Sequence, residues 1–517
     1  MAEKKRNGLR LAALLAAQIL LLTLLVWMFG TRRLDGDDAG EMILADLLAR
    51  EGGILSTNWY YSTEFRVLNT QILTSLLFRL TDNWRLVRTL SAGIHASLMI
   101  LSYLFLCGRL PEPDGERLRR WAPVVLLPFS YVYLDIVLYD MYYIPHISIM
   151  FLSLGLLVSR KRRRLDAVLP LLLAFAAGLG GIRIPAVGYA PMFAASLYAY
   201  LAHKDRRTPA LSLAACFSAG AGYLVNALVL TRRYTVMSYG EIAPVLPDLQ
   251  RLKRIAVQTL EVCGAGALTV SVNGAGSVCG LLLALCILCA FAVAVIRRRE
   301  ISMPAQTVIL TYVFSYAATA AVSAFTSLAT ANRYFILPCI GLVPILAEGT
   351  SLLGEKLRKT ATAAVASLLL VCSFAQVHRF ATVNKLAEVQ PAYDYILDSG
   401  MTFGYSTWEV GDVLTEVSDG RIHMCKIQNF QTMWHWNNLM EKDYMKYAQD
   451  GPVFALLDKR RMNHTDENKD YFYGSWTEED LTWTRQAKIG FEDDKYVVWV
   501  FSSEAEFEAL TGSRPHD

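Results

Sequence analysis

Long apolar stretches recur along most of this chain, and they constrain its fold more than any other feature. Eleven windows are predominantly apolar, at about 11–29, 87–107, 122–138, 144–159, 167–182, 185–201, 209–230, 277–296, 305–328, 334–350 and 361–377. About 20 apolar residues in a row are enough for a helix to cross a bilayer. We therefore predict a polytopic α-helical membrane protein with about 11 transmembrane helices.

The composition agrees with membrane spans and disagrees with a chain of soluble domains. Of the 517 residues, 54% are hydrophobic and only 19% are charged, and the mean hydropathy is +0.32. Soluble domains are about 45–50% apolar and about 25% charged. The length alone would allow two or three soluble domains, but the composition excludes them for most of the chain.

Basic residues alternate from one loop to the next between these windows. They cluster at 4–10, 109–120, 160–164, 204–207, 297–299 and 356–359, whereas the short loops in between carry few. Cytoplasmic loops of membrane proteins are enriched in Lys and Arg. We therefore predict a plasma-membrane protein with a cytoplasmic N-terminus. Because eleven spans are an odd number, the loops 30–85 and 231–276 and the C-terminal tail then lie outside.

The charge balance divides the chain near residue 385. Residues 1–385 contain 38 basic and 22 acidic residues, whereas residues 386–517 contain 12 and 24. The basic excess flanks the apolar windows, which indicates membrane orientation and no nucleic-acid partner. We predict a transmembrane domain over 1–385 and a small extra-cytoplasmic α/β domain over 386–517. Its expected strands are 402–406, 422–427, 453–457 and 496–501, and its expected helices are 392–398, 410–417 and 440–449.

Three acidic residues follow the first apolar window, at Asp37, Asp38 and Glu41. The residues 41–50 have an apolar face and are followed by Gly52, so we expect a helix here, lying on the outer membrane surface. Asp37 or Asp38 could simply cap this helix. One acid would suffice for a cap, and three acids in five residues repel one another, which favours a shared cation or a catalytic role.

This arrangement resembles the GT-C superfamily of integral-membrane glycosyltransferases, which use polyprenyl-phosphate-linked sugar donors. Members carry an acidic pair in the first outer loop beside a helix parallel to the membrane, a long outer loop after the seventh span and often an extra-cytoplasmic domain. Asp37-Asp38, the helix over 41–50, the loop 231–276 and the tail match these features. The segment after the helix lacks the proline found in the protein-mannosyl and aminoarabinose branches, so the resemblance does not extend to their acceptors.

The resemblance implies a bacterial enzyme that transfers a hexosyl or pentosyl unit from the lipid donor to a cell-envelope acceptor at the outer face. Asp37 or Asp38 would be the general base for the acceptor hydroxyl. Glu41 would orient that base, or would hold a divalent cation such as Mg²⁺ or Mn²⁺ together with Asp38. No cofactor is certain from the residues alone.

Five residues at outer span ends are candidates for binding the donor: Tyr143, His146, Arg183, Arg333 and Tyr334. His146 follows a proline near the start of a span, and Arg183 lies in a short glycine-rich turn. Arg333 is the only charge between the ninth and tenth windows on that side. An aromatic belt or a snorkelling arginine would explain some of them; a lipid phosphate needs such counter-charges.

Tyr60, Tyr61 and Arg66 follow the expected surface helix and are candidates for contacting the acceptor. Two other functions remain open. A transporter or lipid-linked-glycan flippase would need polar groups near the middle of the membrane, whereas these candidates gather at one face. A non-catalytic scaffold that presents the tail predicts that Asp37, Asp38 and Arg333 lie far apart.

Overall fold

The structure is a computed structural model. It describes residues 2–62, 65–159, 165–237, 242–266, 271–328, 330–428, 430, 433, 435–448, 451–461 and 481–513. The basic loop 160–164 that helped to predict the orientation lies outside the described residues.

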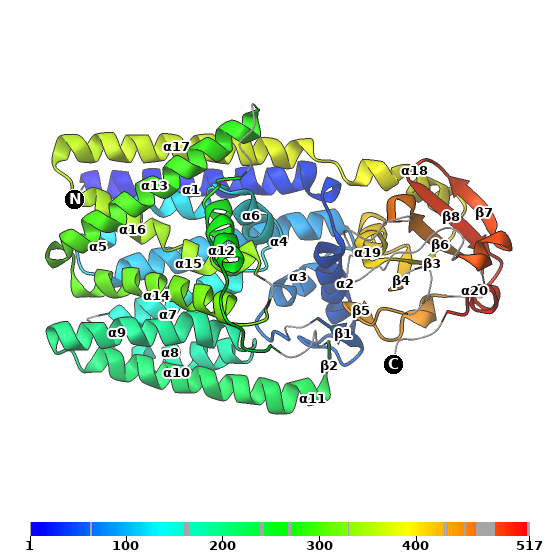
Figure 1. The fold of residues 1–517 in the computed structure, drawn as a ribbon, viewed down its shortest axis with the longest axis horizontal. Coiled ribbons are helices and arrows are strands. Elements are labelled where there is room, and N and C mark those ends of the chain that lie inside the picture. Colours follow the sequence, from blue (N-terminus) through cyan, green and yellow to red (C-terminus); the bar gives the residue numbers. More distant parts are fainter. Residues whose placement is uncertain are drawn as a thin grey trace.

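A body of helices running alongside one another makes up the first three quarters of the chain (Figure 1). Its principal helices are α1 (Ala2–Phe29), α4 (Trp84–Arg109), α7 (Ile144–Val158), α8 (Leu165–Gly178), α9 (Ala190–His203), α10 (Arg207–Val225), α13 (Val272–Ile296), α14 (Met303–Phe325), α16 (Leu342–Ser351) and α17 (Glu355–Thr382). The N-terminus lies at one end of this body and the tail at the other (Figure 1).

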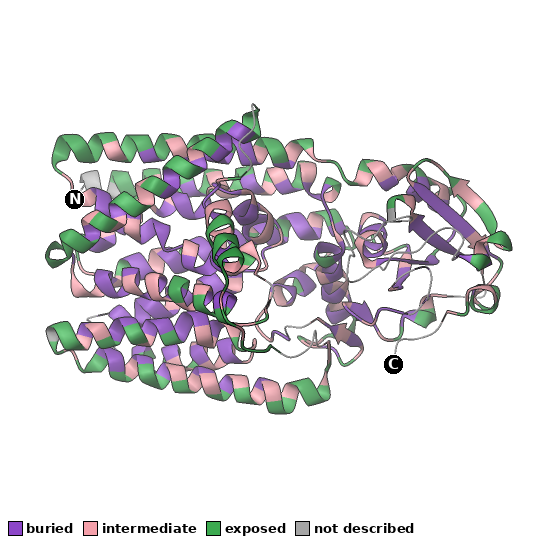
Figure 2. Ribbon diagram, in the orientation of Figure 1, coloured by how far each residue is buried: buried purple, intermediate pink, exposed green. Residues whose placement is uncertain are grey.

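The outward faces of this body are apolar and uncovered. Figure 2 shows exposed residues along α13 and α17, and these include Leu285, Leu288 and Phe374, each at least half exposed. Large apolar side chains in such numbers on a surface mark a membrane contact. The body is that of a polytopic membrane protein, as the apolar windows predict.

The number of spans depends on how two bent segments are counted. Among the described residues, six helices are long and apolar enough to cross a membrane, and there are up to eight if each of two bent pairs is one span. One pair is Tyr131–Tyr139 with α7, bent by 86°, and the other is Asn332–Cys339 with α16, bent by 41°. The count of eleven stays a prediction.

The window 122–138 is the clearest departure from a regular span. It forms the 3₁₀ turn η2 (Ala122–Leu126), a short helix α6 (Tyr131–Tyr133) and the π-helical η3 (Leu134–Tyr139). Pro123 and Pro128 lie in this stretch, and proline removes a backbone donor and clashes with the preceding turn. A hydropathy window reads this segment as one helix because it does not register the prolines.

Shorter elements complete the body. Its tail end carries η1 (Gly30–Arg32), α2 (Gly36–Glu51) and α3 (Gln71–Phe78), and α5 (Asp114–Arg120) lies at the N-terminal end. Helix α15 (Ile336–Cys339), which follows η7 (Asn332–Phe335), lies midway along the body (Figure 1). The loop after α10 continues as η5 (Asn226–Leu230) and α11 (Thr231–Arg233) and later forms α12 (Leu249–Val262); η4 (Pro185–Tyr189) precedes α9. In Figure 1, α2 lies across the end of the body, between the long helices and the tail.

The tail folds around a five-stranded mixed sheet in the order β4-β3-β6-β8-β7. The strands are β3 (Phe403–Ser406), β4 (His423–Lys426), β6 (Val453–Asp458), β7 (Lys488–Glu492) and β8 (Tyr496–Phe501), and the helices are α18 (Leu386–Asp398), α19 (Trp408–Val417) and α20 (Glu504–Thr511). β3 pairs in parallel with β4 and β6, whereas β8 is antiparallel to β6 and β7. The four expected strands are confirmed, and β7 is an addition.

The helix expected over 440–449 is wrong. Its first residues form the short strand β5 (Met440–Glu441), followed by the 3₁₀ turn η8 (Tyr444–Tyr447). β5 pairs antiparallel with β1 (Trp59–Tyr61) of the first loop, and β1 pairs in parallel with β2 (Thr235–Val236) of the second long loop. The backbone partners that override the local helical pattern come from two distant segments, and this small sheet ties all three predicted outer segments together.

α2 also differs from its expectation. Gly52 ends it as expected, with a φ of +74° that suits glycine. Its apolar side chains, however, pack on protein and not on a lipid surface: Met42 and Ala45 contact Trp84 and Val87 in one cluster, and Leu44, Leu47 and Leu48 pack with Trp59 and Phe65 in another. The helix is therefore an internal element of the tail end.

Candidate active site

The N-terminus of α2 is capped by Asp35, which the sequence reasoning overlooked. The Asp35 carboxylate accepts hydrogen bonds from the backbone amides of Asp37 and Asp38, each at 3.1 Å. The Asp38 carboxylate accepts in return from the Asp35 amide at 3.4 Å, which completes a capping box. The expectation that Asp37 or Asp38 is the N-cap of α2 is therefore wrong, because Asp35 has that role.

A cavity of about 680 Å³ opens between α2, the end of the helical body and the tail. Its charged lining residues are Asp37, Asp38, Glu41, Arg88, Asp140, Arg183 and Arg333, with Tyr334 beside them. Val236 and Ile242 of the second long loop and Asn438 and Leu439 of the tail complete the wall. The first-loop acids and the candidate donor-binding residues Arg183 and Arg333 thus line one cavity, whereas His146 is not among its lining residues.

Asp37 and Asp38 are neighbours in sequence but lie in different surroundings. The Asp37 side chain is exposed to the cavity. Desolvation by the surrounding protein, followed by the Asp35 carboxylate, raises the pKa of Asp37, and the Arg333 guanidinium opposes this shift. Asp38 is buried, and burial raises the pKa of its carboxyl strongly. Its side chain lies within hydrogen-bonding reach of Asp140, so two acids share this inner position.

Glu41 lies one turn further along α2 and contacts Arg66. Glu41 Oε1 and Arg66 Nη2 are 3.6 Å apart. Burial raises the pKa of Glu41, and the guanidinium of Arg66 opposes the shift. Arg66 is itself 6% exposed and stacks on the ring of Tyr142 at 3.5 Å. Arg66 is therefore a buried partner of Glu41. Its expected contact with an acceptor remains a prediction.

Arg183 and Arg333, the two arginines expected to bind the sugar donor, both lie close to the ring of Tyr334. The Arg183 guanidinium lies 4.9 Å and that of Arg333 5.9 Å from the centre of the Tyr334 ring. Arg183 also donates a hydrogen bond to the hydroxyl of Tyr143. A planar guanidinium presents several donors to a phosphate, so this cluster offers two cations at one side of the cavity.

Tyr143 and His146 form a layer behind these arginines. Tyr143 is 1% and His146 6% exposed, and their ring centres are 5.7 Å apart. Tyr143 reaches the site through Arg183, and His146 reaches it through Tyr143. Direct contact of these two residues with a donor stays a prediction.

Tyr60 and Tyr61 belong to β1, beside the cavity. The buried hydroxyl of Tyr61 donates to the carbonyl of Ser56 at 3.1 Å and accepts from its amide at 2.9 Å. Tyr60 packs against the core of the tail, with its ring 5.4 Å from Lys442 Nζ. These contacts tie both residues into the small three-stranded sheet, and their contact with an acceptor stays a prediction.

The tail contributes charge as well as cover. Lys426 on β4 is 1% exposed, and its ammonium donates to Asp412 at 2.7 Å and to the carbonyl of Leu439. Lys426 also lowers the pKa of Asp37. Burial raises the pKa of Asp412 to about 6, which Lys426 opposes. The ammonium of Lys426 in the tail thus affects the pKa of Asp37 in the first outer loop.

The described residues contain no group of three or more His, Cys, Asp or Glu side chains arranged to hold a metal ion. Asp38 is engaged with the Asp35 amide and with Asp140, and Glu41 faces Arg66. Glu41 Oε2, in contrast, is buried without a hydrogen-bond partner in the described part of the chain. The divalent cation itself stays a prediction.

Several residues at this site escaped the sequence reasoning. Arg88 and Asn226 are isolated polar residues inside apolar windows, which is a recognised signal of function in membrane segments. Glu416 and Lys426 carry no comparable signal, because charged residues are common in a domain such as the tail.

Comparisons with known proteins find the fold but no sequence family. No family model and no curated protein matches the sequence. Among solved structures, ArnT from Cupriavidus metallidurans in the apo state aligns with a TM-score of 0.55 at 11% identity, covering 96% of this chain and 98% of that one. The same protein bound to undecaprenyl phosphate aligns with a TM-score of 0.53 at 12% identity, with the same coverage.

A third solved structure is more distant. The Archaeoglobus fulgidus oligosaccharyltransferase in complex with zinc and sulfate aligns with a TM-score of 0.47 at 14% identity, covering 86% of this chain and 68% of that one. The alignment with ArnT runs over nearly all of both chains. In fold, the chain is therefore similar to ArnT over nearly its whole length.

Proposed function

We propose that this protein transfers a sugar from a polyprenyl-phosphate-linked donor to a cell-envelope acceptor at the outer face of the plasma membrane. One observation carries the proposal: a single cavity holds Asp37 together with Arg183 and Arg333. It is supported by the fold, which is similar to that of a protein solved with undecaprenyl phosphate bound. The sugar and the acceptor are left open.

In the proposed reaction, a hydroxyl oxygen of the acceptor attacks the anomeric carbon of the donor sugar. The bond between that carbon and the phosphate oxygen breaks, and its electron pair leaves with the polyprenyl phosphate. The hydroxyl proton passes to Asp37, which acts as the general base. Arg183 and Arg333 stabilise the negative charge that develops on the leaving phosphate. No further reactant is needed for this balance.

Asp37 is a better candidate for the base than Asp38. It opens to the cavity, whereas Asp38 is buried in the capping box and beside Asp140. A general base must reach the proton that it removes. We assign to Asp38 the role of fixing the first turn of α2, and to Glu41, through its contact with Arg66, the role of fixing the next turn.

The polyprenyl chain has an apolar path beside these charges. Ile182, Ile242 and Val322 line the cavity and are 53%, 62% and 38% exposed. A lipid-linked substrate needs a cavity whose polar end holds the phosphate and whose apolar side opens toward the bilayer. The lining of this cavity supports this arrangement, since it combines charged side chains with apolar ones.

The proposal includes an orientation, with a cytoplasmic N-terminus and the tail outside. The tail end and the N-terminal end lie at opposite ends of the helical body (Figure 1). Single cysteines at the exposed positions Glu51 and Asp443 should both react with a membrane-impermeant maleimide added to intact cells, whereas a cysteine at exposed Glu355 should not. If only the cysteine at position 355 were labelled, that end of the protein would lie outside and the proposed orientation would be wrong.

The assay that tests the function measures both products. Purified protein in liposomes is given a polyprenyl-phosphate-linked sugar and an envelope extract as acceptor. We expect free polyprenyl phosphate and sugar-labelled acceptor to appear together. If the labelled lipid crosses the bilayer with its sugar still attached and no polyprenyl phosphate is released, the protein is a flippase and the proposal is wrong.

A further inference from the structure

We propose that Arg88 and Glu416 are positioning residues, whose buried ion pair clamps α2 between the helical body and the tail and so presents Asp37 to the cavity. The inference rests on the proposed function for its meaning, but it concerns two residues outside the proposed chemistry. They lie on α4 of the body and α19 of the tail, 328 positions apart in sequence.

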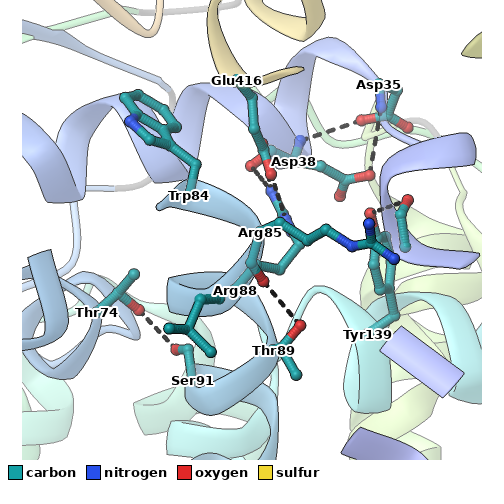
Figure 3. A network of polar contacts seen from close by, with 12 residues as sticks. Asp35, Asp38, Thr74, Trp84, Arg85, Arg88, Thr89, Ser91, Tyr139 and Glu416 are labelled. Carbon is teal, nitrogen blue, oxygen red and sulfur yellow. Dashed lines mark hydrogen bonds and ion pairs between the residues drawn. The ribbon is translucent and has the colours of Figure 1, made fainter. Parts of the chain in front are cut away.

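The contacts of Arg88 join three segments through one guanidinium (Figure 3). Arg88 Nε donates to Glu416 Oε1 and Arg88 Nη2 to Glu416 Oε2, each at 2.6 Å. Nη2 also donates to the backbone carbonyl of Asp38 at 2.9 Å. The arginine and glutamate side chains are 3% and 1% exposed. One side chain thus holds α4, α19 and the first turn of α2 in fixed relation.

This geometry needs the fork of an arginine. Two parallel donors meet the two carboxylate oxygens, and a donor remains for the Asp38 carbonyl. A lysine at this position would keep the charge but has no planar fork, so it could not make the same set of contacts. The arginine at position 88 therefore fixes the position of the first turn of α2 and also supplies a positive charge.

The packing of α2 against α19 leaves little room for movement. A Cβ added at Gly36 would lie 2.2 Å from the Trp408 side chain, and one added at Gly40 would lie 3.2 Å from Asp412 Oδ2. These two glycines are one turn apart, so the tail helix seats directly on the backbone of α2. A second tie lies nearby, where Asp419 accepts from the amide of Trp84 at the start of α4.

Stability alone does not explain a buried ion pair. Removing two charges from water costs nearly as much as their attraction returns, and apolar replacements of similar size are often as stable. What apolar side chains cannot supply is a donor to the Asp38 carbonyl. The pair is therefore best explained by the position that it gives to the first turn of α2, which carries Asp37.

The decisive variant is Glu416→Gln, and Glu348→Gln is its matched control. Glu348 is also fully buried and also paired with an arginine, Arg117, at 2.9 Å, but it lies on α16 at the N-terminal end of the body. Glu416→Gln leaves the buried Arg88 without its charged partner, whereas Glu348→Gln leaves the half-buried Arg117 paired with Asp114. Both variants remove a buried carboxylate, so both should lower the yield of folded protein, the control by less. Only Glu416→Gln should reduce kcat per folded molecule, by about 10²-fold, with the KM for donor unchanged because Arg183 and Arg333 are untouched.

A double variant separates position from stability. Arg88→Leu with Glu416→Leu removes both charges, so its yield of folded protein should exceed that of Glu416→Gln. Its kcat should stay low, because the donor to the Asp38 carbonyl is gone. Arg88→Lys should give a kcat between wild type and the double variant. If the folded fraction of Glu416→Gln has the wild-type kcat, or if the double variant recovers it, the clamp is wrong.

Hydrogen exchange keeps the inference testable without an assay of transfer. Amides of 36–51 should exchange faster in Glu416→Gln than in wild type, and should be unchanged in Glu348→Gln. Should wild type transfer no sugar at all, the proposed function fails while this comparison still decides the clamp. Equal exchange of 36–51 in both variants would overturn it.

Discussion

The two ends of the helical body carry similar residues in opposite arrangements. At the N-terminal end, arginines pair with acids: Arg109 with Asp166, Arg117 with Asp114 and Glu348, and Arg297 with Glu300. At the tail end, Asp37, Arg183 and Arg333 face a common cavity. These pairs neutralise part of the charge at the first end, and the remaining basic residues flank the spans, which suits an orientation signal. Charge at the second end is turned toward a space where a ligand would fit.

The difference lies in what covers each end. Among the described residues, the N-terminal end has short connections such as α5, whereas the tail end has α2, the small sheet of β1, β2 and β5, and the whole tail beyond them (Figure 1). A charged group surrounded by protein in this way is removed from bulk water, so its electrostatic interactions with a substrate are strengthened. Covering one end therefore turns ordinary outer-face charges into a candidate site.

The largest effect is expected at Asp37. Asp37→Asn keeps the shape of the side chain but removes a carboxylate that can accept a proton, so transfer should fall by about 10²–10⁴-fold. The cap of α2 is supplied by Asp35, so folding should be unaffected. The measurement is the rate of polyprenyl phosphate release at saturating donor.

Asp166→Asn is the control from the opposite end, where the acid pairs with Arg109. It should leave the rate per folded molecule at the wild-type value. If the two variants lose activity equally, the contrast between the ends is not functional and Asp37 is not the base.

A smaller effect is expected at the arginines of the cavity. Arg333→Ala removes one of two cations beside Tyr334, and loss of one donor to a developing charge typically costs about 10²-fold in kcat. Arg297→Ala, which alters an exposed pair with Glu300 at the other end, should change transfer by less than twofold, in keeping with the small worth of exposed ion pairs. Transfer by Arg333→Ala at the wild-type rate would remove the arginine from the proposed reaction.

The pH dependence should be shifted by less than these losses. A base must be unprotonated to act, so transfer falls as the pH drops through the pKa of Asp37. Desolvation and Asp35 raise that pKa, so the acid limb should lie above the ordinary aspartate value of about 3.9. Because Arg333 lowers the pKa of Asp37, Arg333→Ala should move the limb further up. A limb that moves down in Arg333→Ala would contradict the assignment.

Much of this architecture can be predicted from sequence, because periodicity and composition are local properties. The apolar windows locate the helical body, and the acids after the first of them locate the candidate site together with Arg183 and Arg333. The cap at Asp35 was missed because three acids stand close together and local rules cannot rank them. The packing of α2 on protein, the strand β5 in place of a helix and the pair of Arg88 with Glu416 depend on partners tens to hundreds of positions away, which one sequence does not reveal.

The smallest effect on transfer is expected at the boundary of the candidate site. Tyr61 lies beside the cavity, but both of its hydroxyl contacts go to Ser56. Tyr61→Phe leaves the buried Ser56 amide without its partner, which should lower the free energy of unfolding by about 1–3 kcal/mol. The rate per folded molecule should stay within twofold of wild type, since nothing in the cavity is changed. Thermal denaturation in detergent beside the transfer assay separates the two readouts. If Tyr61→Phe instead keeps its stability and raises the KM for acceptor, the tyrosine reaches the acceptor and the boundary of the site must be moved to include β1.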